Sequence, residues 1–154
     1  MTTFSNAAGS WTGTNGFRLM PDDAMAEFPS TATVTSAAGG HLTAVAYGWR
    51  HPEDGPQEGL LTIGSTGDGS PVVLWGDSWH QQPAAMTLTG QPGADETVVV
   101  EGNYGEGWRW LIGLDATDPE QLRLWMKNAV PGDLVPEGKS SEPYPVMEMT
   151  LRRA

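Results

Sequence analysis

The sequence predicts an all-β protein, a single up-and-down antiparallel β-barrel of about ten strands. First, short segments in which apolar and polar residues alternate follow one another almost from end to end of the 154 residues. Second, the 20 glycines and 12 prolines are spread at regular intervals, as many short strands require. Third, the seven tryptophans lie in or beside these alternating segments, so their rings fall on particular faces of the strands.

Ten segments read as strands, and turn-forming residues separate them. Asp68-Gly69 is a strong hairpin signal between two of them. The predicted strands are Ser10–Leu19, Ser30–Ala37, Leu42–Arg50, Glu58–Ser65, Val72–Trp79, Ala84–Gln91, Thr97–Tyr104, Trp108–Asp115, Leu122–Val130 and Tyr144–Arg153. The strand from Leu122 is ambiguous, because the preceding Asp118-Pro-Glu-Gln can also begin a short helix.

Two stretches interrupt the alternation. In Met20–Phe28, Pro21 at a first helical position is followed by two aspartates, which suits one short helix or lid. Pro131–Pro143 is the longest stretch without a pattern, and we expect a mobile loop there. Because no repeat or linker divides the chain, residues 1–154 are predicted to form one domain. Ten sequential strands can form a sandwich or a barrel, and closure favours the barrel because it removes exposed edges.

Charge and composition exclude several classes of partner. Eight basic and 19 acidic residues give a formal net charge of −11, which repels phosphate backbones and anionic membranes. We therefore expect no nucleic-acid partner and no membrane partner. Cysteine is absent, which excludes disulfides, thiolate catalysis and cysteine-ligated metals. No signal-like N-terminus and no long apolar run occur, so we expect a soluble, cytoplasmic protein.

The opening Gly9-Ser-Trp11-Thr-Gly13 resembles the Gly-x-Trp-x-Gly start of the calycin superfamily, which includes lipocalins, fatty-acid-binding proteins and nitrobindins. Leu61-Thr-Ile63, Trp75-Gly-Asp-Ser-Trp79 and Met147-Glu-Met-Thr-Leu-Arg152 are also similar to a bacterial calycin-like domain family of unknown function. The likeness spans nearly the whole chain. It implies a closed barrel in which the first tryptophan, here Trp11, packs at the closed end.

Nitrobindins, within that resemblance, imply a haem bound through a histidine of the last strand. The matching segment Tyr144–Leu151 holds no histidine. Met147 or Met149 can in principle ligate iron, although methionines in a barrel are more often plain packing. We therefore expect no cofactor.

None of the three histidines lies among the residues that a metal site or a serine hydrolase would need. His41, His51 and His80 all lie near predicted turns. His51 with Glu53 and Asp54 gives a loose surface cluster, whereas a metal usually needs three converging protein ligands, so no metal site is expected. Ser78 and His80 share a face but lack a sharp elbow and an orienting third group, which argues against a serine hydrolase.

The segment around Asp77 is the best candidate for a functional wall. On a strand, Trp75, Asp77 and Trp79 share one face. An aspartate desolvated between two tryptophans would have a raised pKa and could act as a general acid or base. Alternatively, Asp77 faces solvent or bonds a neighbouring backbone amide near the end of the strand.

A second wall is predicted at Trp108 and Trp110, which share one face, while Arg109 takes the other. A charge inside a barrel needs a partner or a ligand. Arg109 and Glu148 of the last strand are therefore either a buried pair or a site that grips a carboxylate, or both point outward. Sequence does not decide which face is the inner one, because these barrels carry apolar side chains on both.

These observations favour a barrel that binds a small hydrophobic or aromatic molecule in its cavity, as a monomer or a homodimer. The expected ligand-binding residues are Tyr47, Trp49, Trp75, Asp77, Trp79, Trp108, Arg109, Trp110 and Met147. The resemblance also implies an alternative, because some calycin-like barrels are decarboxylases or cyclases. The acid–base candidates for such a cofactor-independent enzyme are Asp77, Glu148, Tyr104 and Tyr144. A third interpretation is a filled barrel with a structural or assembly role.

Overall fold

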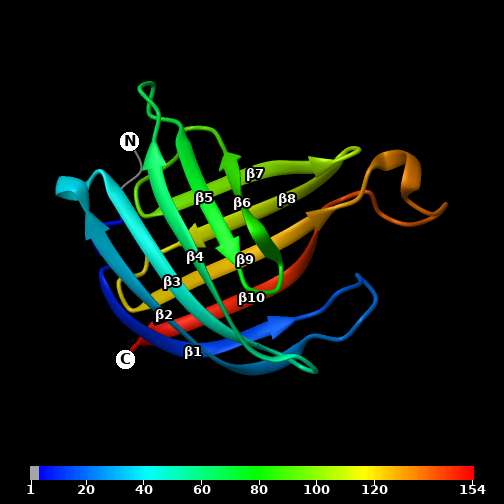
Figure 1. Ribbon diagram of the computed structural model, residues 1–154, viewed down its shortest axis with the longest axis horizontal. Coiled ribbons are helices and arrows are strands. Elements are labelled where there is room, and N and C mark those ends of the chain that lie inside the picture. Colours follow the sequence, from blue (N-terminus) through cyan, green and yellow to red (C-terminus); the bar gives the residue numbers. More distant parts are fainter. Residues whose placement is uncertain (1–3) are drawn as a thin grey trace.

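The computed structural model describes residues 4–154 and shows ten antiparallel strands closed into a barrel (Figure 1). The strands are β1 (Gly9–Phe17), β2 (Ala26–Ala37), β3 (Leu42–His51), β4 (Gly55–Ser65), β5 (Pro71–Asp77), β6 (Gln81–Thr89), β7 (Thr97–Gly105), β8 (Trp108–Asp115), β9 (Gln121–Ala129) and β10 (Tyr144–Arg153). Each strand pairs with the next one in the chain, and β1 pairs with β10 to close the barrel. The predicted fold class is confirmed.

The short helix expected after the first strand is a turn. The Asp23 amide donates to the Met20 carbonyl at 3.1 Å, and the Met20 amide donates to Asp23 Oδ2 at 3.1 Å. Strand β2 then begins at Ala26, four residues before the predicted start. Pro29 lies within it without disruption, because β2 pairs with β3 only from Thr31 onward, so the missing proline amide removes no bond to β3.

The other ambiguous segments are also resolved. The stretch before β9 is a turn, closed by the Gln121 amide on the Asp118 carbonyl at 3.1 Å, and β9 is a regular strand. Two single-turn 3₁₀ helices, η1 (Ala38–Gly40) and η2 (Gly132–Leu134), lie in loops. Within the part of the chain that the structure describes, no helix has the length and apolar character to cross a membrane.

The up-and-down order gives the barrel two different ends. We call the end formed by the β1–β2, β3–β4, β5–β6, β7–β8 and β9–β10 connections the mouth. The other end, the base, holds the start of β1 and the end of β10 (Figure 1). Trp11 is 1% exposed and lies in β1 at the base, where its indole Nε1 donates to the Ala7 carbonyl at 2.8 Å and the Arg153 guanidinium lies 4.4 Å from its ring. Trp11 therefore seals the base.

Alternate residues of the strands fill the interior. Towards the base, the inward side chains are mostly aliphatic. The largest fully buried ones include Leu61, Leu88, Ile112, Leu124 and Met126. Two rings lie flat across glycines. A Cβ on Gly59 would meet the Tyr47 ring at 2.2 Å inside the barrel, and a Cβ on Gly113 would meet the Trp125 ring at 2.1 Å outside it. These two glycines are therefore required by side-chain packing.

The barrel is incompletely paired between β6 and β7. Among the described strands, these two are joined at a single register position, Thr89 with Glu101. We call the unpaired stretch on the mouth side of that position the seam. Pairing on either side aligns Trp75 with Met86 and Gly102 with Trp110, so two tryptophans flank the seam from β5 and β8.

Candidate functional site

Seven ring side chains converge inside the barrel next to the mouth, and we call them the aromatic layer. Its members are Phe17, Trp49, His51, Trp75, Trp79, His80 and Trp110. They come from the mouth ends of β1, β3, β5 and β8 and from the β5–β6 turn. Neighbouring ring centroids lie 4.6 to 6.5 Å apart, the range of favourable aromatic pairs.

Asp77 holds one side of this layer in place. The residue ends β5, is 4% exposed, and accepts four hydrogen bonds. Oδ2 accepts from the Tyr47 hydroxyl at 2.7 Å and from Trp49 Nε1 at 3.1 Å. Oδ1 accepts from the backbone amides of Trp79 at 2.8 Å and His80 at 2.9 Å. A single carboxylate therefore fixes two strands and the β5–β6 turn relative to one another.

The Tyr47 hydroxyl extends this network to a third ring. While it donates to Asp77, it accepts from Trp75 Nε1 at 2.8 Å. Burial raises the pKa of Tyr47 well above 10, and the neighbouring Asp77 charge raises it further. Tyr47 therefore stays protonated at physiological pH and keeps donating to Asp77 while it accepts from Trp75.

The role of Asp77 follows from these contacts. A carboxylate offers about four lone-pair sites, and protein donors occupy all four of them. The alternative in which Asp77 bonds backbone amides near the end of its strand is the one that the structure shows. No acceptor position is left for a substrate proton, so the geometry supports a structural role and not general acid–base chemistry.

His80 and His51 were not expected among the binding residues, yet both rings belong to the layer. Desolvation lowers the pKa of His80 from 6.5 to about 4, opposed by the charge of Asp77 and aided by His51, so His80 is neutral at physiological pH. Its Nε2 lies 2.9 Å from the sulfur of Met147, which is 1% exposed. His51 Nδ1 accepts from the backbone amides of Glu53 and Asp54 at 3.1 and 3.0 Å.

Trp79 is one of the two partly exposed members of the layer, the other being His80. Trp79 lies on the β5–β6 turn and stacks on His51 with centroids 4.6 Å apart at 23°. Its indole Nε1 donates to the exposed Asp54 Oδ2 at 2.7 Å. The Trp79 ring therefore covers the layer from the mouth. It is held by the stack on His51, by the hydrogen bond to Asp54, and by edge-to-face contacts with Phe17, Trp49 and His80.

Other predicted residues lie elsewhere. Arg109 points outward and pairs with Glu101, the guanidinium and carboxylate 2.7 Å apart. Glu148 is exposed on the outer face of β10, opposite Trp125. Of the three alternatives for Arg109 and Glu148, the structure therefore shows the one in which both side chains point outward.

The remaining aromatic candidates form the rim of the mouth. Trp108 is partly buried beside Tyr104, with ring centroids 6.2 Å apart. The Tyr104 hydroxyl donates to Asn128 Oδ1 at 2.5 Å, and the Tyr144 hydroxyl donates to the Leu19 carbonyl at 3.0 Å. Burial raises the pKa of Tyr104, so it remains protonated at neutral pH. These side chains tie the mouth loops together.

Three members of the layer were not predicted as site residues, namely Phe17, His51 and His80, and the sequence signals for them differ. Phe17 is in phase with Trp11 on the first strand, so strand periodicity alone predicts that it points inward. Strand alternation predicts His80 on the face of Ser78, opposite Asp77, but β5 ends at Asp77 and the turn rotates the side chains that follow. His51 ends β3 in phase with Tyr47 and Trp49, a signal that its position next to a turn obscured.

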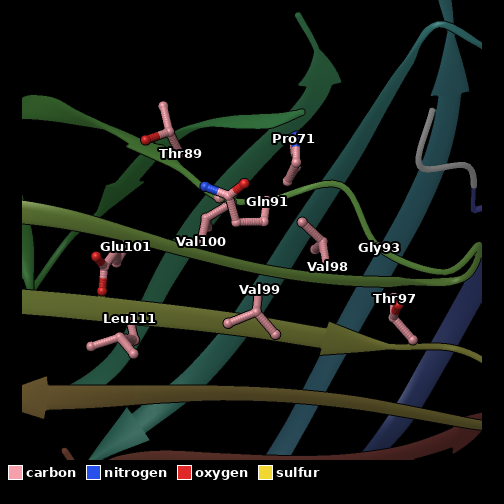
Figure 2. A pocket seen from close by; sticks show the side chains of 11 residues that line it. Pro71, Thr89, Gln91, Gly93, Thr97, Val98, Val99, Val100, Glu101 and Leu111 are labelled. Atoms are coloured by element: carbon pink, nitrogen blue, oxygen red, sulfur yellow. The ribbon is translucent and has the colours of Figure 1, made fainter. Parts of the chain in front are cut away.

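Two surface hollows differ in their relation to the aromatic layer. A hollow of about 440 Å³ lies between the β6–β7 loop and β7, where Gln91, Val99 and Glu101 line it, and no member of the layer contributes to it (Figure 2). A groove of about 740 Å³ runs over β2–β5, and its lining includes Leu60 and Leu74 together with Tyr47, Trp75 and Asp77. Trp49, Trp79 and Trp110 line neither hollow, so a ligand in contact with these three rings needs side chains to move.

The last strand holds no histidine, so the haem ligand that the nitrobindin resemblance implies has no counterpart there. Met147, one of the two methionines considered as iron ligands, contacts His80 Nε2 through its sulfur. Within residues 4–154, no three His, Cys, Asp or Glu side chains gather closely enough to hold a metal ion.

Comparisons with known proteins define the fold class. Neither a protein-family model nor a curated protein matches the chain. Among solved structures, the chain is similar to the crystal structure of Rv2717c from M. tuberculosis, with a TM-score of 0.65. The match covers 97% of this chain and 94% of that chain at 12% sequence identity. At this identity the similarity shows a shared antiparallel barrel fold.

Proposed function

We propose that the protein is a calycin-like barrel that binds one small hydrophobic or aromatic molecule at its mouth, against the aromatic layer. The observation that carries this proposal is the layer itself. Rings from four strands and one turn meet inside the barrel, while Tyr47, Trp49, Trp75 and Asp77 satisfy one another's polar groups. Such a rigid, apolar surface with few polar atoms is typical of small-molecule sites.

The arrangement of the mouth supports a route to this surface. Large apolar side chains are exposed on the mouth connections and at the mouth end of β7: Leu19 and Met20 at 56% each, Leu134 at 55% and Tyr104 at 47%. Trp79, the member of the layer that lies on the β5–β6 turn, stacks on His51 and donates to Asp54. In the proposal, Trp79 swings outward and the ligand takes the place of its ring, with Met147 as an adaptable floor.

The experiment is a titration followed by intrinsic tryptophan fluorescence, with naphthalene, indole, 1-aminoanthracene and hemin as probes. We expect saturable quenching by the three apolar aromatic probes at one site per chain, and none that saturates with hemin. Failure of all apolar probes to bind contradicts the proposal and favours a filled structural barrel.

Matched variants locate the site. Trp79→Ala removes the ring with which the ligand competes, and a stack of this kind contributes about 0.5–1.5 kcal/mol. We therefore expect the variant to bind 1-aminoanthracene roughly 2- to 12-fold tighter than the wild type. Trp125→Ala removes a ring from the outer face of β9 and should leave the affinity unchanged. Equal affinities for all three proteins would place the ligand elsewhere.

A further inference from the structure

One polar group of the aromatic layer lacks a partner. Trp110 is 8% exposed, and its indole Nε1 is buried without a hydrogen-bond acceptor among residues 4–154. The other three tryptophans of the layer all donate their indole N–H, to Asp77, Tyr47 or Asp54. A buried donor without an acceptor is costly and uncommon in folded proteins. The Trp110 N–H is thus the one indole donor of the layer available to a ligand.

The surroundings of Trp110 can adapt to a guest. Its ring stacks on Trp75 with centroids 5.5 Å apart at 7°. On β7 its register neighbour is Gly102, the first residue of the seam after Glu101. A Cβ on Gly102 would lie 3.0 Å from the Met86 sulfur and 3.3 Å from the Thr87 carbonyl oxygen, so the flexible Met86 side chain covers the seam at this point. A planar molecule can displace this thioether without breaking a register pair, because β6 and β7 are not paired on the mouth side of Thr89 and Glu101.

The charges near Trp110 select against an anion. Asp77 borders the layer, where the Tyr47 hydroxyl connects it to Trp75, the ring on which Trp110 stacks. Its oxygens are bonded to neutral donors only. The nearby His80 is neutral at physiological pH, and Arg109, next in sequence to Trp110, points outward to Glu101. An anionic ligand would therefore meet a negative charge in a poorly solvated site with no cation to offset it.

We infer that the ligand is an uncharged aromatic molecule with an acceptor oxygen, such as an aryl ketone, aldehyde or amide, and that Trp110 Nε1 donates to this oxygen. This inference rests on the proposed function and names its ligand class. The aromatic ring of the ligand packs on the layer, and the single acceptor sets its orientation.

The test compares acetophenone with ethylbenzene, a hydrocarbon of similar shape without the acceptor, on the wild type and on Trp110→Phe. The ratio of the two dissociation constants is taken within each protein. Effects that both ligands share, such as altered packing after the loss of the indole ring, then cancel. One neutral hydrogen bond corresponds to roughly a 2- to 12-fold effect, so we expect the preference for acetophenone to fall by that factor in Trp110→Phe. Trp125→Phe should leave the ratio as in the wild type, and benzoate should bind more weakly than acetophenone.

A second measurement does not depend on a variant. In ¹⁵N-labelled wild-type protein, acetophenone should shift the Trp110 indole N–H resonance downfield, whereas ethylbenzene should not. An unchanged ratio together with an unmoved resonance, while ethylbenzene binds, overturns the ligand class and leaves the proposed function standing. If neither compound binds the wild type, the proposed function fails, and this inference fails with it.

Discussion

Replacement of Asp77 by asparagine should loosen the aromatic layer while preserving nearly all of its volume. Asparagine has one side-chain oxygen, so it can accept from only one of the two donor pairs that Asp77 serves. The Tyr47 and Trp49 donors are buried, whereas the amides of Trp79 and His80 are partly buried. We expect the amide oxygen of Asp77→Asn to face the first pair and its NH₂ group to face the two turn amides.

The magnitude follows from that geometry. Each buried donor left without an acceptor costs about 1–3 kcal/mol, and water can partly replace the acceptor at the turn. The Asp77→Asn change should therefore lower the free energy of unfolding by about 3 kcal/mol, against a total of about 5–15 kcal/mol for a domain. Asp77→Ala loses all four bonds and should lose more. Tyr47→Phe should cost about 1–3 kcal/mol, because it leaves the Trp75 indole N–H unpaired.

The assay is urea unfolding followed by tryptophan fluorescence and far-ultraviolet circular dichroism. With an m value of about 1–3 kcal/mol/M, the midpoint of Asp77→Asn should fall by about 1–3 M with m unchanged. A loss below about 1 kcal/mol for Asp77→Asn, or equal losses for the asparagine and alanine variants, would show that the carboxylate does not organise the layer and would refute this reasoning.

Three further changes test other parts of the barrel. Because the pKa of His80 is lowered from 6.5 to about 4, the unfolded chain binds the extra proton between these values. The free energy of unfolding should fall, by at most about 3 kcal/mol, as the pH is lowered from 6.5 to 4; parallel profiles for the wild type and His80→Gln would contradict this. Asn15 is 1% exposed with both amide atoms unpaired, so Asn15→Val should be neutral or stabilising by on the order of 1 kcal/mol in urea unfolding, and a clear loss would speak against it. Gly113→Ala should cost about 1–3 kcal/mol because its Cβ meets the Trp125 ring. The Trp125→Ala background should remove most of that loss, and an undiminished loss there would contradict the packing.

Strand periodicity brought much of the layer within reach of prediction. Trp75 and Asp77 are two residues apart on one strand, as are Tyr47 and Trp49, so their shared face follows from the alternation of side chains. The structure brings these four together. Arg109, in contrast, lies outside the site and pairs with Glu101 on β7. The register between β7 and β8, which brings these two side chains together, cannot be derived from the sequence of either strand.

The choice of inner face could not be made from the sequence. Leu60 and Leu74 are apolar but lie 46% and 52% exposed on the outside, so hydrophobicity alone does not mark the interior. The sequence also does not show how the chain turns at the end of a strand, and hence where the next side chains point. His80 points inward because β5 stops at Asp77 and the carboxylate caps the turn, and no local pattern encodes where a strand stops to within one residue.

The sequence by itself determined the class of fold, the number of strands and their approximate bounds, because periodicity and turn chemistry are local properties of the chain. Only the tertiary structure decided which rings contact one another, which carboxylate accepts four hydrogen bonds, and which indole N–H has no acceptor. Those properties depend on the register between strands and on closure of the barrel, through which residues distant in the chain, such as Tyr47, Asp77 and Trp110, become parts of one site.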